Sequence, residues 1–247
     1  MGFLNLFEGI YWRLPYKLRR LIYKLLRPHE YNRYQELINT KPQSPRAYSL
    51  YSYIENKCIF VHIPKCAGVS ISHALFGHLG GGHLSITAYQ RIFNQKEFNE
   101  FFKFSFVRNP WDRLVSAFFF MKQGGFDSKD QVWAKSHLNS YQSFDQFVID
   151  WLTQANAVQG IHFKPQYSFL CLPNSLDPQV NFIGRFENLE SDYSIVCKKL
   201  GLPVQPLTRE NKSNLESADY RTYYNRQTRR IVSQVYGEDI ELFKYIF

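Results

Sequence analysis

The sequence predicts an α/β fold with a central parallel sheet flanked by helices. Three apolar stretches, 58–63, 102–107 and 180–186, each lead directly into a helical pattern. Buried parallel strands read as continuous apolar runs, and the helices that connect them cover the faces of the sheet. The chain has 247 residues, of which 45% are hydrophobic and 21% are charged. This composition suits one globular domain and argues against disorder.

The first element along the chain is a short basic helix. Over residues 16–27, apolar side chains recur at helical spacing on one face, and five Lys or Arg residues cover the other. This helix either docks on the domain or binds an anionic membrane surface. Residues 39–49 are rich in Pro and Ser, which is typical of a linker. We therefore expect a basic helix with its linker over 1–46 and a single domain over 47–247.

Helical segments follow each predicted strand and complete the C-terminal part of the chain. The segment after the third strand ends at Gly201, with Pro203 beyond it, as helices commonly end. The predicted helices of the domain are, in order, 71–77, 108–123, 187–201, 218–236 and 239–247.

Charge and cysteine usage restrict the partners. The formal net charge is +9, and residues 1–46 carry nine Lys or Arg against three Glu. The body is therefore only mildly basic, which argues against a nucleic-acid partner. The 4 cysteines lack the spacing of a metal site or a disulfide framework. Neither a clean signal peptide nor a long apolar run is present, so we expect a cytoplasmic location, with or without membrane association.

The segment 64–70 has the character of a phosphate-binding loop. It joins a buried strand to a helix, where unpaired N–H groups and the helix dipole favour an anion. Gly68 would let the backbone approach a ligand, Ser70 could cap the helix or donate to an oxygen, and Lys65 supplies a charge. An ordinary strand–turn–helix connection is the alternative. The candidate binding residues are Pro64, Lys65, Cys66, Ala67, Gly68, Val69 and Ser70.

Two standard phosphate chemistries do not fit this loop. The Walker pattern GxxxxGK[ST] is absent, which disfavours an ordinary nucleotide hydrolase. Cys66 lacks the arginine that a tyrosine-phosphatase loop carries, because Ser72 stands at that spacing. We therefore interpret Cys66 as a small loop residue and not as a nucleophile.

A second anion site is predicted where the strand 102–107 ends. Arg108 follows that strand, at the edge of the sheet where α/β proteins bind ligands. Ser116 lies about two helical turns further on. A guanidinium fork with a hydroxyl is suited to a second phosphate. Alternatively, Arg108 pairs with Asp112 and Ser116 only packs.

The motifs IPKCAGVS (63–70) and FVRNPWDRLVSAF (106–118) resemble the two binding elements for 3′-phosphoadenosine-5′-phosphosulfate (PAPS) in the carbohydrate sulfotransferases of the chondroitin and heparan-sulfate type. The resemblance extends over about residues 58–247, through the blocks 161–170, 182–193 and 210–214. It implies a P-loop-like nucleotide-binding sulfotransferase fold. The first motif would bind the 5′-phosphosulfate and the second the 3′-phosphate.

The same resemblance implies further cofactor contacts. Arg185 follows the third strand and stands near the cofactor, where it could instead form a neutral pair with Glu187. Lys212 and Ser213 would close over the nucleotide. Two loop positions depart from the family, which usually carries Thr where this chain has Cys66 and often Thr where it has Val69. Both changes remove a hydroxyl.

The resemblance also implies the catalytic groups. Lys65 would stabilise the charge that develops on the leaving oxygen. The base should be a histidine or a carboxylate. His83 is the first candidate, because it lies in a glycine-rich connection between the two motifs and matches a histidine of the related enzymes. His162 is the second candidate, followed by the less favoured His78 and His73.

Three functions remain open from the sequence. The first is an active PAPS-dependent sulfotransferase that modifies a hydroxyl acceptor of the carbohydrate class, without a metal. The second is a nucleotide-dependent phosphotransferase on a similar fold. The third is a family member that binds the nucleotide but has lost catalysis, which the changes at Cys66 and Val69 keep open.

Overall fold

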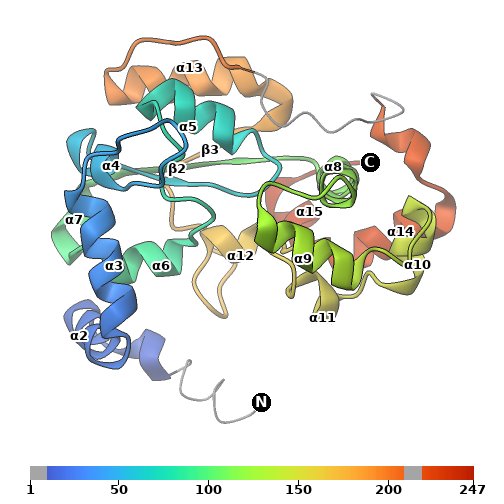
Figure 1. Ribbon diagram of the computed structural model, residues 1–247, viewed down its shortest axis with the longest axis horizontal. Helices are drawn as coiled ribbons and strands as arrows, with labels where there is room; N and C mark the ends of the chain where they lie inside the picture. Colours follow the sequence, from blue (N-terminus) through green and yellow to red (C-terminus); the bar gives the residue numbers. More distant parts are fainter. Residues whose placement is uncertain (1–9, 209–218) are drawn as a thin grey trace.

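The computed structural model describes residues 10–208 and 219–247 (Figure 1). Within these residues, three strands form one sheet in the order β1-β2-β3: β1 (Cys58–Val61), β2 (Phe102–Val107) and β3 (Phe182–Arg185). Both strand pairs are parallel, and Phe60 of β1 lies opposite Phe104 of β2. The predicted α/β class with a central parallel sheet is therefore confirmed.

The strands form because their residues are apolar on both faces. All four residues of β1 are buried, and so are five of the six residues of β2. The rings of Phe60 and Phe104 stack across the two strands with centroids 4.9 Å apart. Such two-sided burial requires helices on both faces of the sheet.

The helices surround the sheet and extend beyond one end of it. Figure 1 shows α5 and α13 on one side of the strands, α6 and α12 on the other, and α9, α10 and α14 in a separate group. The α-helices are α2 (Tyr16–Leu26), α3 (Pro28–Asn39), α4 (Tyr51–Glu55), α5 (Gly68–Phe76), α6 (Ile86–Ile92), α7 (Gln95–Glu100), α8 (Pro110–Lys122), α9 (Ser128–His137), α10 (Phe144–Asp150), α11 (Gln154–Ala157), α12 (Tyr167–Leu170), α13 (Leu189–Leu200), α14 (Arg226–Val235) and α15 (Gly237–Phe243), with 3₁₀ turns at η1 (Phe186–Asn188) and η2 (Tyr220–Tyr223).

One predicted helix is wrong in its extent. The segment 218–236 does not form a single helix, because η2 ends at Tyr223 and α14 begins at Arg226. Asn225 causes the break, since its side chain accepts hydrogen bonds from the N–H groups of Gln227 and Thr228. An asparagine in this role starts a new helix.

The N-terminal helix occupies residues 16–26, close to its predicted range, and packs against α3 and α6. Helix α3 is not among the predicted helices, although Pro28 stands at its first turn. The expected linker lies along the body of the protein, where Ser49 donates its N–H to the Gly80 carbonyl at 2.9 Å. The division between residues 46 and 47 stays a prediction. In the described ranges, no helix has the length and apolar character needed to cross a membrane.

Candidate active site

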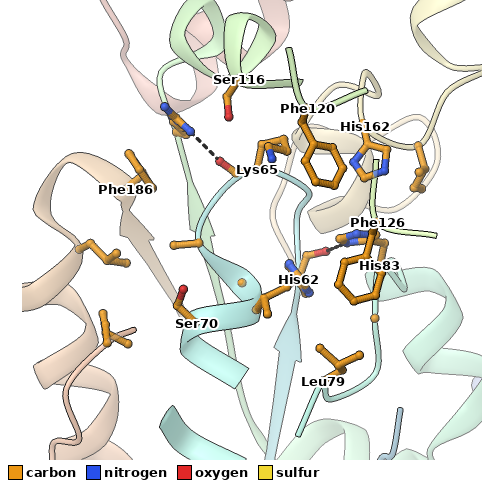
Figure 2. Close-up of a pocket in the computed structure, with 18 of the residues that line it drawn as sticks. His62, Lys65, Ser70, Leu79, His83, Ser116, Phe120, Phe126, His162 and Phe186 are labelled. Atoms are coloured by element: carbon orange, nitrogen blue, oxygen red, sulfur yellow. Dashed lines mark hydrogen bonds between the residues drawn. The ribbon is translucent and has the colours of Figure 1, made fainter. Parts of the chain in front are cut away.

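A cavity of about 1100 Å³ opens at the carboxyl ends of the three strands. Lys65 follows β1, Arg108 follows β2 and Phe186 follows β3, and all three line it. Ligands of parallel α/β sheets bind at this edge. Figure 2 shows the two sides of the cavity, with Ser70, Ser116 and Phe186 on one side and His83, His162 and Phe126 on the other.

The predicted phosphate loop turns sharply before α5. Lys65 and Ala67 have left-handed backbone conformations, with φ of 68° and 61°. Non-glycine residues adopt this region at a cost, and it is one of the conformations from which anion-binding nests are built. Ala67 is the N-cap of α5 and makes no side-chain cap bond. Ser70 is the third residue of the helix and lines the cavity, so it does not cap the helix.

Gly68 is required for a reason that the sequence did not reveal. A Cβ atom at this position would lie 1.8 Å from the Cδ2 atom of His62. The glycine therefore makes room for the His62 ring, which forms part of the cavity wall. Gly68 was expected to make room for a ligand, but the group that lies close to it is the His62 ring.

Lys65 is a half-buried cation at the centre of the site. Burial, together with the nearby Arg108, lowers the pKa of Lys65 to about 7. Its Nζ atom lies 3.6 Å from the centroid of the Phe120 ring. In the part of the chain that the structure describes, no carboxylate forms an ion pair with it. A largely desolvated ammonium in this setting is stabilised by a bound anion.

Pro64 and Cys66 belong to the loop but do not line the cavity. The Cys66 Sγ atom lies 3.5 Å from the Oε1 atom of Gln166, on the side away from the cavity. Burial raises the pKa of Cys66 to about 12, which keeps the thiol protonated and fits its interpretation as a loop residue. Only the backbone of these two residues is available for a role in binding.

Gln166 joins the two predicted binding elements, and the sequence analysis missed it. Its Oε1 atom accepts from the Arg108 N–H at 2.9 Å, and its Nε2 atom donates to the Arg108 carbonyl at 2.9 Å. The same Oε1 atom is the one that contacts Cys66. Gln166 is fully buried. It therefore fixes the phosphate loop relative to the end of β2.

Arg108 pairs with Asp112, which is the alternative considered from the sequence, and it also lines the cavity. Its Nε and Nη2 atoms donate to the Asp112 carboxylate at 2.7 and 2.8 Å, and its Nη1 atom donates to the Lys65 carbonyl at 3.1 Å. The guanidinium also lies 4.0 Å over the Phe186 ring and lines the cavity. Ser116 lines the cavity as well and is 5% exposed.

Three histidines meet on the opposite side of the cavity. The ring centroids of His62 and His83 are 4.4 Å apart, and those of His83 and His162 are 5.7 Å apart. His83 Nδ1 donates to the His62 carbonyl at 3.1 Å (Figure 2). Because a carbonyl can only accept, neutral His83 carries its proton on Nδ1 and leaves Nε2 as an acceptor.

The electrostatics favour neutral imidazoles at His83 and His62. Burial and the neighbouring His162 lower the pKa of His83 to about 4. Burial, His83 and His162 also lower the pKa of His62 well below its usual value. Neutral His83 can accept a proton at physiological pH. The structure thus presents a base candidate in the correct protonation state.

Asp130 completes the cluster and was not singled out from the sequence. Its carboxylate accepts from His162 Nε2 at 3.1 Å and from the Phe126 N–H at 2.9 Å. A Cβ atom on Gly125 would lie 2.2 Å from the Cβ atom of Asp130, so the glycine lets the chain wrap closely around this carboxylate. No local sequence pattern marks Asp130 as a site residue, because only the fold brings it to His162.

The profile of the sulfotransferase family matches residues 54–246. The chain therefore belongs to the sulfotransferase family. The resemblance drawn from the two motifs is confirmed by this match, which covers both of them.

This sulfotransferase is similar to several curated proteins. An uncharacterised protein of Archaeoglobus fulgidus is 33% identical over 124 residues, which cover 47% of this chain and 82% of that protein. Carbohydrate sulfotransferase 10 of Xenopus laevis is 28% identical over 179 residues, covering 60% of this chain and 48% of the relative. Carbohydrate sulfotransferase 9 of Homo sapiens is 27% identical over 173 residues, which cover 60% of this chain and 38% of the relative. The chain thus spans about half the length, or less, of these carbohydrate sulfotransferases. No solved structure matches it significantly.

Some predicted site residues of this sulfotransferase lie elsewhere. Arg185 does not line the cavity, because its guanidinium donates to the Phe243 carbonyl and lies 4.6 Å over the Tyr245 ring. Its expected partner Glu187 instead accepts from the Asn109 N–H at 2.6 Å. Arg185 therefore does not face this cavity, and its assignment to the cofactor stays a prediction. Lys212 and Ser213 lie outside the described residues.

The two less favoured histidines serve the framework of the sulfotransferase. His78 is buried between the Ser52 hydroxyl, 2.9 Å from its Nε2 atom, and the Gly80 N–H, which donates to its Nδ1 atom at 3.1 Å. His73 has its Nε2 atom 2.9 Å from the Pro45 carbonyl. Neither residue lines the cavity.

The mouth of the cavity is aromatic on the histidine side. Tyr48 and Phe126 line it and remain 49% and 44% exposed. Exposed rings beside polar groups provide flat apolar surfaces with hydrogen-bonding neighbours. Asp127 and Lys129 supply charged groups nearby. Over residues 10–208 and 219–247, no cluster of three or more His, Cys, Asp or Glu side chains could hold a metal ion.

Proposed function

We propose that this protein transfers a sulfuryl group from PAPS to a hydroxyl of a carbohydrate. The observation that carries the proposal is one cavity that holds both a half-buried cation, Lys65, and a neutral base candidate, His83. Membership in the sulfotransferase family supports the reaction class.

The residues present fit the donor. A bound phosphosulfate would neutralise Lys65, which has no ion pair within the described residues, and would accept from the N–H groups at the start of α5. Arg108 and Ser116 would hold the 3′-phosphate. In the absence of nucleotide, the pair with Asp112 would keep the Arg108 guanidinium in place. We also assign Lys212 and Ser213 to the nucleotide, as the family resemblance implies.

The donor supplies the sulfuryl group and a phosphate leaving group. Neutral His83 would take the proton of the acceptor hydroxyl on its Nε2 atom as that oxygen bonds to sulfur. The electron pair of the broken S–O bond would go to the phosphate oxygen. The Lys65 ammonium would stabilise the charge there. His162, oriented by Asp130, is the alternative base in the same cavity.

A carbohydrate acceptor is supported by the mouth of the cavity. Tyr48 and Phe126 could stack against the apolar face of a sugar ring, and the flanking polar groups could bind its hydroxyls. Several of the similar proteins are named carbohydrate sulfotransferases. A nucleic-acid acceptor remains disfavoured by the mild charge of the body.

Sulfate transfer from labelled PAPS to a panel of polysaccharides, small glycosides and lipids tests the activity. We expect transfer to at least one glycan, and we expect it to survive chelation of divalent metals. In parallel, 3′-phosphoadenosine-5′-phosphate should raise the Tm more than ATP does. Nucleotide binding without transfer to any acceptor would support a family member that has lost catalysis. Preference for ATP would contradict the donor assignment.

A further inference from the structure

The N-terminal helix α2 docks on the body through polar and aromatic side chains. Tyr16 donates its hydroxyl proton to the Phe93 carbonyl at 3.2 Å, and Arg19 donates to the Gln90 side chain at 2.8 Å. Tyr23 is the one buried residue of the helix. This arrangement is the reverse of an ordinary amphipathic surface helix, which turns its apolar face toward the core.

The apolar side of α2 is left in solvent as a result. Leu18, Leu21, Leu25 and Leu26 are 42%, 51%, 69% and 65% exposed; we call these four residues the leucine face. Of the 14 strongly exposed large apolar side chains among the described residues, five lie between residues 10 and 26. Scattered exposed leucines are normal, but a clustered set on one helix marks an interaction surface.

The charged residues of α2 and its flanking positions are all positive. Residues 10–27 contain six Lys or Arg and no Asp or Glu. Arg19 and Arg20 face the body, where Arg20 donates to the Ile92 carbonyl at 3.3 Å. The exposed cations that remain beside the leucines are Arg13, Lys17, Lys24 and Arg27.

We infer that α2 binds the surface of an anionic lipid bilayer, with the leucine face inserted among the acyl chains and these four cations at the headgroups. Apolar side chains flanked by Lys and Arg are the chemistry of helices that lie in the membrane interface. Pairing of two leucine faces would instead bring two cationic rims together, which opposes self-association.

The position of the helix agrees with this role. Figure 1 shows α2 at the margin of the molecule, beside α3 and away from α8 and α9, whose residues line the cavity. With 11 residues, α2 is about 16 Å long, which suits a helix lying along a surface and is too short to span a bilayer. A docked bilayer would therefore leave the cavity open.

Vesicle flotation of the full chain tests the inference. We expect binding to vesicles that contain phosphatidylglycerol, little binding to pure phosphatidylcholine, and release in high salt. Leu21→Glu/Leu25→Glu should reduce the bound fraction at least tenfold, and Lys17→Gln/Lys24→Gln should reduce it several-fold. The matched control, Ile149→Glu/Ile195→Glu, changes two apolar residues that are 44% and 51% exposed on other helices and should bind like the wild type.

Several results would overturn the inference. Wild-type protein that fails to float with anionic vesicles in low salt excludes it. So does a Leu21→Glu/Leu25→Glu variant that binds normally, or a control that loses binding equally. If sedimentation shows a dimer that the leucine variant disrupts, and no vesicle binding occurs, the leucine face joins two copies of the chain. Circular dichroism and Tm verify that every variant is folded.

Discussion

One side of the cavity is built around the contiguous loop 65–70, whereas the opposite side takes His62, His83, Asp130 and His162 from four separate segments. The two sides also differ in charge. The first presents a cation at the start of a helix, and the second presents buried neutral imidazoles. We therefore propose a division of labour in which the first side binds the donor and the second acts on the acceptor. Variants on the two sides should then fail in different kinetic constants.

The largest expected effect lies on the histidine side. His83→Ala should lower kcat by about 10²–10⁴-fold, because it removes the proposed base, while affinity for 3′-phosphoadenosine-5′-phosphate stays near wild type. The acid limb of the wild-type pH profile should lie well below pH 6.5, since the pKa of His83 is lowered to about 4 and the neutral ring is the active form. Steady-state kinetics and calorimetry measure the two quantities.

A matched control separates this role from a structural one. His73→Ala changes a histidine outside the cavity and should keep wild-type turnover. If His83→Ala retains most activity while His162→Ala loses it, the role of base passes to His162. If neither variant matters, the division between the two sides of the cavity is wrong.

A smaller effect is expected at the edge of the binding side. Arg108→Ala should weaken binding of 3′-phosphoadenosine-5′-phosphate more than tenfold, because a charge-assisted contact contributes about 1.5–3 kcal/mol. Asp112→Asn is a second variant to measure beside it. This change weakens the ion pair between Asp112 and Arg108, which competes with the phosphate, so it should tighten binding of the nucleotide. Equal affinity of the wild type for nucleotides with and without the 3′-phosphate would refute the assignment.

The pH dependence of binding tests Lys65. With a pKa of about 7 in the free protein, Lys65 is protonated and attractive to phosphate below pH 7 and becomes neutral above it. Affinity for the nucleotide should therefore fall by up to about tenfold per pH unit from pH 7 upward, with proton uptake on binding. The phosphate itself titrates near pH 6, outside this window. Calorimetry in buffers of different ionisation heat measures both effects, and a flat affinity from pH 7 to 9 would contradict them.

The smallest expected effect concerns Asp130, which acts on the site through His162. Asp130→Asn should lower kcat about three- to tenfold, since it replaces the charged acceptor of the hydrogen bond from His162 with a neutral one. The negative charge of Asp130 raises the pKa of His83, so its removal should move the acid limb of the pH profile to still lower pH. An unchanged limb would show that Asp130 serves only the local fold.

The sequence predicts best those features of the fold and the site that residues adjacent in the chain determine. The strand 102–107 was predicted to the residue, and Lys65, Gly68, Ser70, Arg108 and Ser116 all line the cavity. These positions are set by a strand end and the helix that follows it, so the local pattern determines them. His83 was also found, because its glycine-rich connection lies between the two motifs.

Residues whose roles depend on distant partners were missed or misjudged. Asp130 and Gln166 act only because the fold brings them to His162 and Arg108. Arg185 ends β3 next to the cavity, but successive side chains of a strand point to opposite faces, and its own face is covered by Phe243 and Tyr245. For α2, the periodicity predicted the helix but not which face would contact the body.

A residue far along the sequence supports the edge of the site. The Asn109 side chain, at the start of α8, donates to the Ile246 carbonyl at 2.9 Å across 137 residues of sequence. At a synthesis rate of about 5–20 residues per second, roughly 7–30 s separate the two residues on the ribosome. During that interval the phosphate loop and the start of α8 are already synthesised but lack this contact. This edge of the cavity can therefore mature only after residue 246 has been added.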